Sequence, residues 1–494
     1  MAIKMNRSYW NIIEARRQSE RRPNVIIITF DCLRPDRLGG LGYRGVRTPT
    51  FDHLIEESVV FANAYCQAPN TWISHGSLFT GCNPHRHGVR TPIRKISDNV
   101  QTMAETFREA GYSTFGLPAM SLLSKEAGFA RGFDEYCLDQ LQSEEGILSH
   151  RYYRSASDTL TITRSWLKHS SRPFFAWVHY FGIHKVEKSL LDLPTQYRRQ
   201  YSEYAQYYDG KVAFADEQFL APLVAELEAL GLLDETILVL WSDHGDNLHR
   251  VEHNKPQWGH NWALTEDVMR TLLAIRAPWA LPAGGKRDDI AQSIDIFPTL
   301  LDVAGLPSSL DQFEGRSLVA SSPQTDPVVY MENLCQGFVG VRRGRFKLVG
   351  SVSDAPKQHR QDSSTSTDKS AWHIQLRDIA RRLLPAGWGE KGERQSEEEL
   401  TEEKPNPLAS WWKAKGEPEE ILERLLDRGK FELYDLSLDP EEKHNIAAEN
   451  QRLVSEFKHT LQEIATQIVT VQLAYSTGEE EARVEERLRN LGYF

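Results

Sequence analysis

The chain has 494 residues, 40% of them hydrophobic and 26% charged, which is typical of a soluble globular protein with an ample core. Its formal net charge of −11 argues against a nucleic-acid partner, because nucleic-acid-binding surfaces need clustered Lys and Arg. An anionic substrate must therefore be held locally, by a metal ion or a few cations.

The N-terminus and the cysteines bear on the compartment. Residues 1–23 form an N-terminal extension without the apolar core of a secretory signal, and the chain contains no apolar run long enough to span a bilayer. Its five cysteines are an odd number without paired spacing, which disfavours a disulfide framework and a structural zinc cluster. We therefore expect a cytoplasmic protein without a membrane partner. The sequence leaves homo-oligomerisation open.

Residues 24–325 alternate apolar runs with amphipathic stretches. Three near-continuous apolar runs are typical of strands buried on both faces of a mostly parallel sheet, at 24–30, 173–180 and 236–241. Amphipathic stretches between them predict helices, at 99–111 and at 217–231, where the second ends at a glycine suited to a helix C-terminus. The pattern predicts an α/β domain with a mostly parallel sheet flanked by helices.

Within this domain the stretch "QAPNTWISHGSLFTG" at 67–81 predicts a short helix closed by Gly81. A helix made only for packing carries an apolar stripe, but positions one turn apart here hold the hydroxyl of Thr71 and the imidazole of His75. This pairing indicates a role other than packing. The alternative is that Thr71 is a plain N-cap.

The alternation of long apolar runs with amphipathic stretches ends after Pro307, and we place a smaller α+β domain at 326–494. The runs "DPVVYMEN", "GFVGVRRGRFKLVG" and "FELYDLSLDPEEKHN" predict the strands of a short antiparallel sheet. Between them, residues at about 351–430 are polar and predict an insertion that is partly helical, with a helical patch at 372–384.

Polar side chains follow two of the predicted parallel strands. Asp31 comes directly after the first strand, and Asp243 and His244 follow the run at 236–241. Ligands of open α/β sheets bind at the carboxyl ends of strands, so we expect these three side chains to converge. Two carboxylates and an imidazole are a common divalent-metal ligand set. The alternative is that each Asp only begins a turn.

A metal ion at this position gives Thr71 a chemical role. A hydroxyl bound to a metal can be deprotonated and can then attack a phosphorus or sulfur centre. The N–H groups at the start of the helix would help to hold anionic oxygens. Thr71 is therefore a candidate nucleophile and a candidate metal ligand.

The residues of the chain resemble the sulfatase family of the alkaline phosphatase superfamily. The resemblance rests on motifs that occur in the family's order: "NVIIITFDCLRPDRLGGLGY", "YDGKVAFADEQ", "LWSDHGDNL", "WGHN", "SIDIFPTLLDVAGLP", "FEGRSL" and "ELYDLSLDPEEKHN". It implies a sulfatase-like α/β domain, a C-terminal domain with a small antiparallel sheet, and one bound divalent metal ion.

The departures from the family pattern bear on the reaction. The family's nucleophile stands ten residues before the Gly of its "TG" signature, where this chain has Thr71, with Ile73 and His75 in place of the family's Pro and Arg. Sulfatases oxidise a Cys or Ser there to formylglycine, which Thr cannot form because its carbinol carbon bears a methyl group. A Thr nucleophile resembles the phosphatase, phosphodiesterase and phospho-transferase branches of the superfamily.

The metal motifs depart in the same direction. Typical sulfatases have Asp-Asp and Asp-Asn pairs where this chain has Asp31 with Cys32 and Asp243 with His244, and the second pair is similar to phosphonate monoester and phosphodiester hydrolases. An imidazole ligand favours Mn²⁺ or Zn²⁺, with Ca²⁺ or Mg²⁺ as the alternatives. We interpret Cys32 as a buried thiol rather than a ligand.

Other histidines match family positions. The resemblance places His184 at the His of a "PHxP"-like segment of the family and His260 where a His or Lys contacts the substrate or leaving group. We expect both in the site, because imidazole suits proton transfer near neutral pH. His75 is expected to orient Thr71 or to stabilise charge on the transferring group. We assign His179 to the core. A two-metal variant would draw on His253 and Asp209.

We therefore predict a metal-dependent hydrolase that cleaves phosphate monoesters, phosphate diesters or phosphonate esters of a small anionic substrate through Thr71. The first alternative is a sulfuric ester hydrolase or a phospho-group transferase. The second is a sulfatase-like binding module that has lost catalysis, since a fold alone does not settle function.

Overall fold

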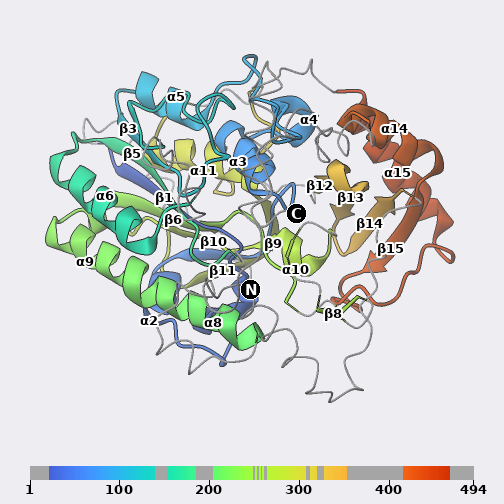
Figure 1. Ribbon diagram of the computed structural model, residues 1–494, viewed down its shortest axis with the longest axis horizontal. Helices are drawn as coiled ribbons and strands as arrows, with labels where there is room; N and C mark the ends of the chain where they lie inside the picture. The colour runs from blue at the N-terminus through green and yellow to red at the C-terminus, as the bar shows by residue number, and fades with distance from the viewer. Residues whose placement is uncertain are drawn as a thin grey trace, which may run out of the picture.

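The structure is a computed structural model. It describes residues 22–138, 153–184, 204–248, 251–252, 255–256, 259–260, 264–307, 312–319, 327–352 and 416–467. Figure 1 shows a large α/β layer structure with a smaller domain beside it, which carries α14 and α15. The expected helical patch at 372–384 and most of the expected insertion lie outside the described residues.

The centre of the larger domain is a nine-stranded, mostly parallel sheet. β1 (Asn24–Phe30) lies between β5 (Phe174–Tyr180) and β6 (Thr236–Ser242) and is parallel to both. These three strands are the predicted apolar runs, and every residue in them is buried. The remaining strands are β2 (Val59–Tyr65), β3 (Ser113–Leu117), β4 (Glu135–Tyr136), β9 (Arg270–Thr271), β10 (Leu273–Arg276) and β11 (Gly285–Gln292).

Helices cover both faces of this sheet, because successive side chains of a strand point to opposite faces. Val25 and Ile27 of β1 belong to one apolar core, and Ile26 and Ile28 belong to the other. The first core is covered by α3 (Thr71–Thr80), α5 (Met103–Glu109) and α11 (Ser293–Ala304). The second is covered by α2 (Pro49–Glu56), α6 (Ala156–His169), α8 (Tyr204–Ala215) and α9 (Ala221–Ala229). The predicted fold class is confirmed.

Two predicted helices are shorter in the structure than in the sequence pattern. The helix expected at 99–111 begins only at Met103, because Thr102 and Glu105 form a capping box. The helix expected at 217–231 begins at Ala221, after a π-helical turn at 216–220. Its last turn is followed by Gly231 with φ 62°, the left-handed conformation that favours glycine after a helix.

The smaller domain is an antiparallel sheet packed against two helices. Its strands follow the order β12 (Val328–Asn333), β13 (Phe338–Arg343), β14 (Phe346–Ser351) and β15 (Lys430–Asp435). A separate apolar core joins this sheet to α14 (Pro418–Arg428) and α15 (Gln451–Ala465). The short elements α4 (Pro84–His87), α10 (Glu266–Met269), β7 (Val251–Glu252) and β8 (Lys255–Pro256) complete the described structure.

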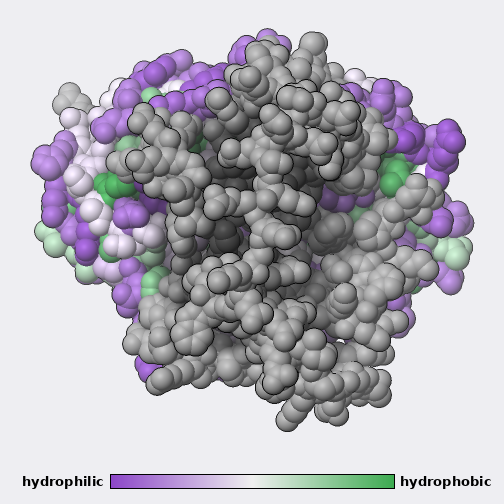
Figure 2. Space-filling model, in the orientation of Figure 1, coloured by the Kyte–Doolittle hydropathy of each residue, from purple (hydrophilic) through white to green (hydrophobic). Residues whose placement is uncertain are grey.

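The described surface is mostly hydrophilic in the view of Figure 2, with apolar residues scattered over it. Leu438 is the large apolar side chain that is most exposed among the described residues, at 81%. Within the described part of the chain, no helix combines the length and the apolar character that a membrane crossing requires.

Candidate active site

The structure brings together the polar side chains at the ends of β1 and β6. Asp31 follows β1, while Asp243 and His244 follow β6, and all three side chains are fully buried. Each of the three offers a potential metal-ligating atom, and these atoms lie within 4.8 Å of one another. Because β1 and β6 are parallel neighbours, their carboxyl ends meet at one edge of the sheet, as predicted.

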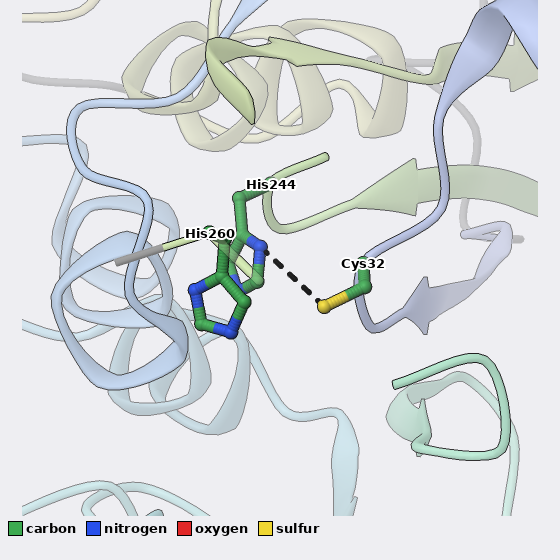
Figure 3. A group of neighbouring side chains, drawn as sticks. All are labelled: Cys32, His244 and His260. Atoms are coloured by element: carbon green, nitrogen blue, oxygen red, sulfur yellow. Dashed lines mark hydrogen bonds between the residues drawn. The ribbon is translucent and has the colours of Figure 1, made fainter. Parts of the chain in front are cut away.

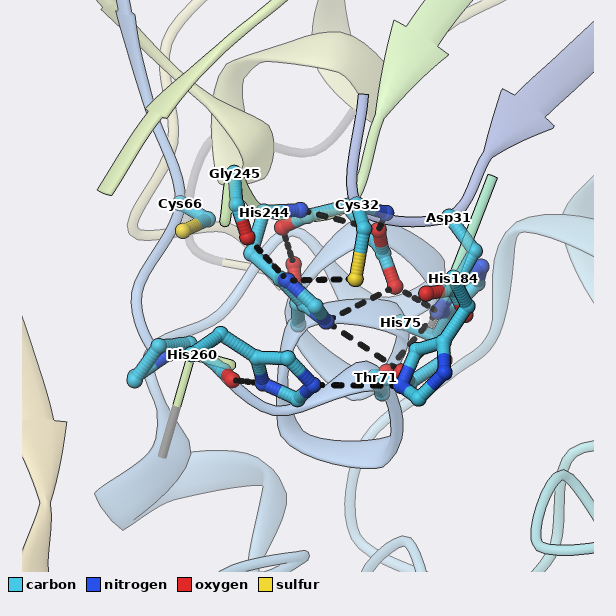
Figure 4. Close-up of polar contacts among 12 residues, drawn as sticks. Asp31, Cys32, Cys66, Thr71, His75, His184, His244, Gly245 and His260 are labelled. Carbon is cyan, nitrogen blue, oxygen red and sulfur yellow. Dashed lines mark hydrogen bonds and ion pairs between the residues drawn. The ribbon is translucent and has the colours of Figure 1, made fainter. Parts of the chain in front are cut away.

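Thr71 enters this cluster from the start of α3 (Figure 4). Asn70 is the N-cap and Thr71 is the first helical residue, so the alternative that Thr71 is a plain N-cap is wrong. Its Oγ1 donates to Asp31 Oδ2 at 3.2 Å and lies 3.3 Å from His244 Nε2. The hydroxyl is therefore aimed at the carboxylate and imidazole rather than at the backbone of its own helix.

The donor set fits a divalent cation. His244 Nδ1–H donates to the Gly245 carbonyl at 2.9 Å, which leaves the Nε2 lone pair facing Asp243 Oδ2 at 3.4 Å. Within the described residues, Asp31 Oδ1 and Asp243 Oδ2 accept no hydrogen bond. The separations of 3.2–3.4 Å between these atoms match the roughly 3.3 Å between neighbouring ligand atoms of a tetrahedral zinc ion. Facing lone pairs at this distance repel unless a cation lies between them.

The electrostatics of the cluster point the same way. Burial raises the pKa of Asp31 to about 7, although hydrogen bonds from Cys32 and Thr71 oppose the shift. Burial, together with the charge of Asp31, raises the pKa of Asp243 to about 7. Burial also lowers the pKa of His244 to about 4, so this imidazole is neutral and able to ligate. The protein alone stabilises these carboxylates poorly as anions, and a bound cation would supply the missing charge.

His75 lies one turn along α3, beneath the nucleophile candidate. Its Nδ1–H donates to the Thr71 carbonyl at 2.8 Å and lies 3.9 Å from Asp243 Oδ2. Trp177 and Trp241 pack edge-on against the ring, and burial lowers the pKa of His75 to about 3. The imidazole is therefore neutral and contacts Thr71 through its backbone carbonyl, so an orienting role for His75 stays a prediction.

His184 and His260 are buried and face each other beside the cluster (Figure 4). Their Nε2 atoms are 3.2 Å apart, and His260 Nδ1 contacts the Pro69 carbonyl. A carbonyl only accepts, so His260 Nδ1 carries a proton and its Nε2 accepts from His184 Nε2–H. Lys211 of α8 donates to the His184 carbonyl at 2.6 Å. The pair holds a transferable proton near Thr71, consistent with the expected place of both histidines in the site.

Sequence reasoning missed His179, which we expected in the core. It is fully buried on β5, but its Nδ1 accepts from Ala119 N–H at 3.2 Å. Nε2 of the neutral ring therefore carries the proton and contacts Asp31 Oδ2 at 3.2 Å. His179 is therefore a close neighbour of a candidate metal-binding carboxylate. The signal in the sequence was an imidazole one residue before the end of an apolar strand.

Of the two residues suggested for a second metal, the structure describes Asp209, which does not join the cluster. Asp209 accepts a hydrogen bond from Tyr43 OH at 2.6 Å and pairs with Arg37 at 3.5 Å, so it serves a different contact. It belongs to none of the ligand groups found among the described residues. His253 lies outside the described residues.

Comparison with known proteins identifies the family. The model of the family described as Sulfatase matches residues 23–306, which is more than half of the chain. The chain belongs to the sulfatase family. Enzymes of this family bind a divalent metal ion, and the cluster at Asp31, Asp243 and His244 supplies matching ligands. The predicted hydrolase of sulfuric or phosphoric ester bonds is confirmed at the level of the family.

Among its relatives, this sulfatase-family protein is 25% identical to a sulfatase of Formosa agariphila over 377 residues, covering 60% of this chain and 72% of the relative. It is also 25% identical to an arylsulfatase of Clostridium perfringens over 387 residues, covering 60% and 78%. These names favour the sulfuric-ester alternative over the phosphate- and phosphonate-ester hydrolysis that we predicted first.

Solved structures share the fold of this sulfatase-family protein. One, in complex with its substrate D-glucosamine-2-N,6-O-disulfate, has a TM-score of 0.60 at 18% identity and covers 91% of this chain and 98% of its own. The phosphonate monoester hydrolase of Agrobacterium radiobacter has a TM-score of 0.59 at 17% identity, covering 91% and 96%. At this identity the likeness shows the fold alone.

Proposed function

We propose that this protein is a metal-dependent hydrolase of sulfuric esters in which Thr71 is the nucleophile. The observation that carries the proposal is the buried Thr71 hydroxyl, 3.2 Å from Asp31 Oδ2 and 3.3 Å from His244 Nε2. A divalent ion held by Asp31, Asp243, His244 and Thr71 would lower the pKa of the hydroxyl and neutralise the sulfate oxygens. The imidazole ligand favours Mn²⁺ or Zn²⁺.

The geometry suggests a double displacement. Thr71 Oγ1 passes its proton towards Asp31 Oδ2, to which it already donates, and forms a bond to the sulfur atom. The S–O bond to the alcohol breaks, and the alcohol leaves with a proton from the pair of His184 and His260. Water then attacks the sulfur and gives a proton back to the pair of His184 and His260. The bond between the sulfur and Thr71 Oγ1 breaks, and Thr71 Oγ1 takes back its proton from Asp31 Oδ2. His75 holds the first turn of α3 in place throughout.

A second candidate function is hydrolysis of phosphate or phosphonate esters. Two observations favour it: Thr71 cannot be oxidised to formylglycine, and the Asp243–His244 pair places an imidazole beside the nucleophile at 3.3 Å. The fold likeness to a phosphonate monoester hydrolase is compatible with both candidates.

A substrate panel separates the candidates. We would load the full-length protein with Mn²⁺ or Zn²⁺ and measure kcat/KM for 4-nitrophenyl sulfate, 4-nitrophenyl phosphate, bis(4-nitrophenyl) phosphate and 4-nitrophenyl phenylphosphonate. Some relatives carry names that refer to sugar sulfates, so N-acetylglucosamine 6-sulfate joins the panel. We expect the sulfates to give the highest values. Higher values for a phosphorus ester would replace the first candidate by the second, and no turnover by the metal-loaded protein would overturn both.

A further inference from the structure

Lys347 is a fully buried cation where the smaller domain meets the larger one. It is the second residue of β14, and its side chain has no exposed surface. Its ammonium donates to Glu266 Oε1 of α10 at 3.0 Å and pairs with Glu442 Oε1 at 2.8 Å. Burial acts to lower the pKa of Lys347, but the charges of Glu442 and Glu266 outweigh it and raise the pKa. We call these three residues the lysine triad.

Glu442 reaches the triad from a rare backbone conformation. It lies after β15 and has a φ of 56°, a left-handed conformation that few residues other than glycine adopt. From there, Oε2 accepts from the backbone N–H of Glu266 at 2.9 Å. Such a conformation persists only where its surroundings fix it. The smaller domain therefore holds the first residue of α10 by its backbone and, through Lys347, by its carboxylate.

The other end of α10 supports the turn that carries His244. Gly245 N–H donates to the Val268 carbonyl at 2.9 Å, and α10 packs so closely here that Gly245 has no room for a side chain. The Gly245 carbonyl accepts from His244 Nδ1–H at 2.9 Å. A displacement of α10 would therefore move the carbonyl that sets the direction of the His244 ring.

The direction of this ring decides several contacts of the candidate active site. His244 Nε2 lies 3.3 Å from Thr71 Oγ1 and 3.4 Å from Asp243 Oδ2. The ring stacks on His260 with 4.1 Å between the centroids, and Cys32 Sγ lies 3.7 Å from Nδ1 (Figure 3). Close contacts on both sides leave little room for a misplaced ring.

α10 also contacts the segment that leads to Thr71. Cys66 N–H donates to the Met269 carbonyl at 3.0 Å, and Tyr65 OH donates to Glu266 Oε2 at 2.6 Å. These two residues end β2 and precede the loop from which α3 begins. The same short helix therefore supports the chain on both sides of the candidate metal site.

We propose that Lys347 and Glu442 are positioning residues, which hold the candidate metal ligand His244 in place through α10. Stability alone explains the lysine triad poorly, because the desolvation of buried charges offsets much of their attraction. The triad lets the smaller domain set the metal affinity of a site that is built from the larger domain. This inference rests on the metal site of the proposed function, but not on the reaction performed there.

Metal affinity tests the proposal without measuring turnover. Metal-free full-length Lys347→Met is titrated with Zn²⁺ by calorimetry, and we expect its dissociation constant to rise about 3- to 30-fold, as for other coupled positions. The control is Glu332→Ala in the smaller domain, whose carboxylate contacts Arg90 and Tyr330 rather than α10, and which should keep the wild-type value. An unchanged constant in Lys347→Met, or an equal rise in the control, overturns the proposal and leaves the proposed function standing. A wild type that binds no Zn²⁺ overturns both.

A second pair of variants covers the case in which Lys347→Met does not fold. Glu442→Asn keeps a residue type that tolerates a positive φ, but its side chain is one methylene shorter. Glu442→Gln keeps the length and an oxygen that can accept from Glu266 N–H. We expect the Zn²⁺ dissociation constant to rise in Glu442→Asn and to return towards the wild-type value in Glu442→Gln. Equal affinities in the two folded variants contradict positioning through this contact.

Discussion

Two buried charged clusters in this protein differ in how their charges are paired. At the domain boundary, Arg90 is 1% exposed and makes a two-pronged contact with Glu332 at 2.7 and 3.0 Å. Glu419 of α14 accepts from both Arg90 and Arg94, at 3.1 and 2.9 Å. We call these four residues the boundary cluster. Its carboxylates form ion pairs with arginine side chains of the protein itself.

In the candidate active site the carboxylates lack such partners. Asp31 and Asp243 are as deeply buried as Glu332, yet each has one oxygen without a hydrogen bond among the described residues. Burial raises the pKa values of Asp31 and Asp243. At Glu419 burial also acts to raise the pKa, but the hydrogen bonds and charges of Arg94 and Arg90 outweigh it, and the pKa falls to about 2. Burial alone therefore does not distinguish a structural cluster from a site. Carboxylate oxygens without a hydrogen bond do make this distinction, because they require a cation from outside the protein.

The largest expected effect comes from Thr71. Thr71→Ala should lower kcat by about 10³-fold or more while the melting temperature changes little, because it removes the attacking hydroxyl and leaves the proposed ligands Asp31, Asp243 and His244 in place. Thr71→Ser should retain turnover. The control is Thr80→Ala at the other end of α3, where the hydroxyl donates to the Gly76 carbonyl and accepts from Cys82 N–H. Undiminished kcat in Thr71→Ala would rule out this nucleophile.

Breaking the boundary cluster should affect stability instead. Glu332→Ala leaves the guanidinium of Arg90 buried without its main partner, and such a loss costs about 3–5 kcal/mol in the free energy of unfolding. Turnover per folded molecule should stay the same. The control is Asp289→Ala, which removes the more exposed partner of Arg287 and should cost at most about 1 kcal/mol. Urea denaturation measures both; equal costs would contradict the comparison.

His75 should matter to turnover through Thr71. His75→Ala removes the donor to the Thr71 carbonyl, and we expect kcat to fall about 10²-fold, an ordinary value for a positioned donor. His75→Gln keeps a donor and should recover part of the loss. His87→Ala is the matched loss of a buried imidazole, which contacts Ser77 on α3. If the His75 variants lose stability but keep their turnover per folded molecule, His75 only packs.

His179 should act on metal affinity. His179→Ala removes the imidazole whose Nε2 lies 3.2 Å from Asp31 Oδ2, and outer contacts to a metal-binding carboxylate are worth about 10–100-fold in metal affinity. Isothermal titration of metal-free protein with Zn²⁺ or Mn²⁺ measures the change, with the His87→Ala variant as control. A metal affinity equal to that of the wild type would indicate that His179 only packs in the core.

The smallest effect is a pH dependence at the boundary cluster. Burial by itself would raise the pKa of Glu419, but the hydrogen bonds and charges of Arg94 and Arg90 lower it from 4.5 to about 2. A carboxyl with a depressed folded-state pKa stabilises above its unfolded value and loses this contribution as the pH falls. The stability difference between wild type and Glu419→Gln, about 1 kcal/mol, should therefore be constant above about pH 5.5 and shrink between pH 4.5 and 2. A difference that grows on acidification would contradict the pairing.

The sequence by itself determined the strands and much of the site. Continuous apolar runs specify β1, β5 and β6, because a strand buried on both faces can hold few polar residues. Given parallel neighbours, the polar residues after β1 and β6 must meet at one edge, which is why Asp31, Asp243 and His244 could be grouped from sequence. The antiparallel sheet of the smaller domain also followed from its strand and turn pattern.

Only the tertiary structure decided which other side chains face this edge. Cys32 lies near these side chains because its own backbone is in the left-handed conformation. His179 lies near them because the register of β5 on β1 sets it beside Thr29. The boundary cluster joins Arg90 to Glu332 across 242 positions of the chain. Periodicity along a sequence records which face of an element is buried, but the direction of one side chain and the pairing of distant charges depend on contacts that form only when the elements pack.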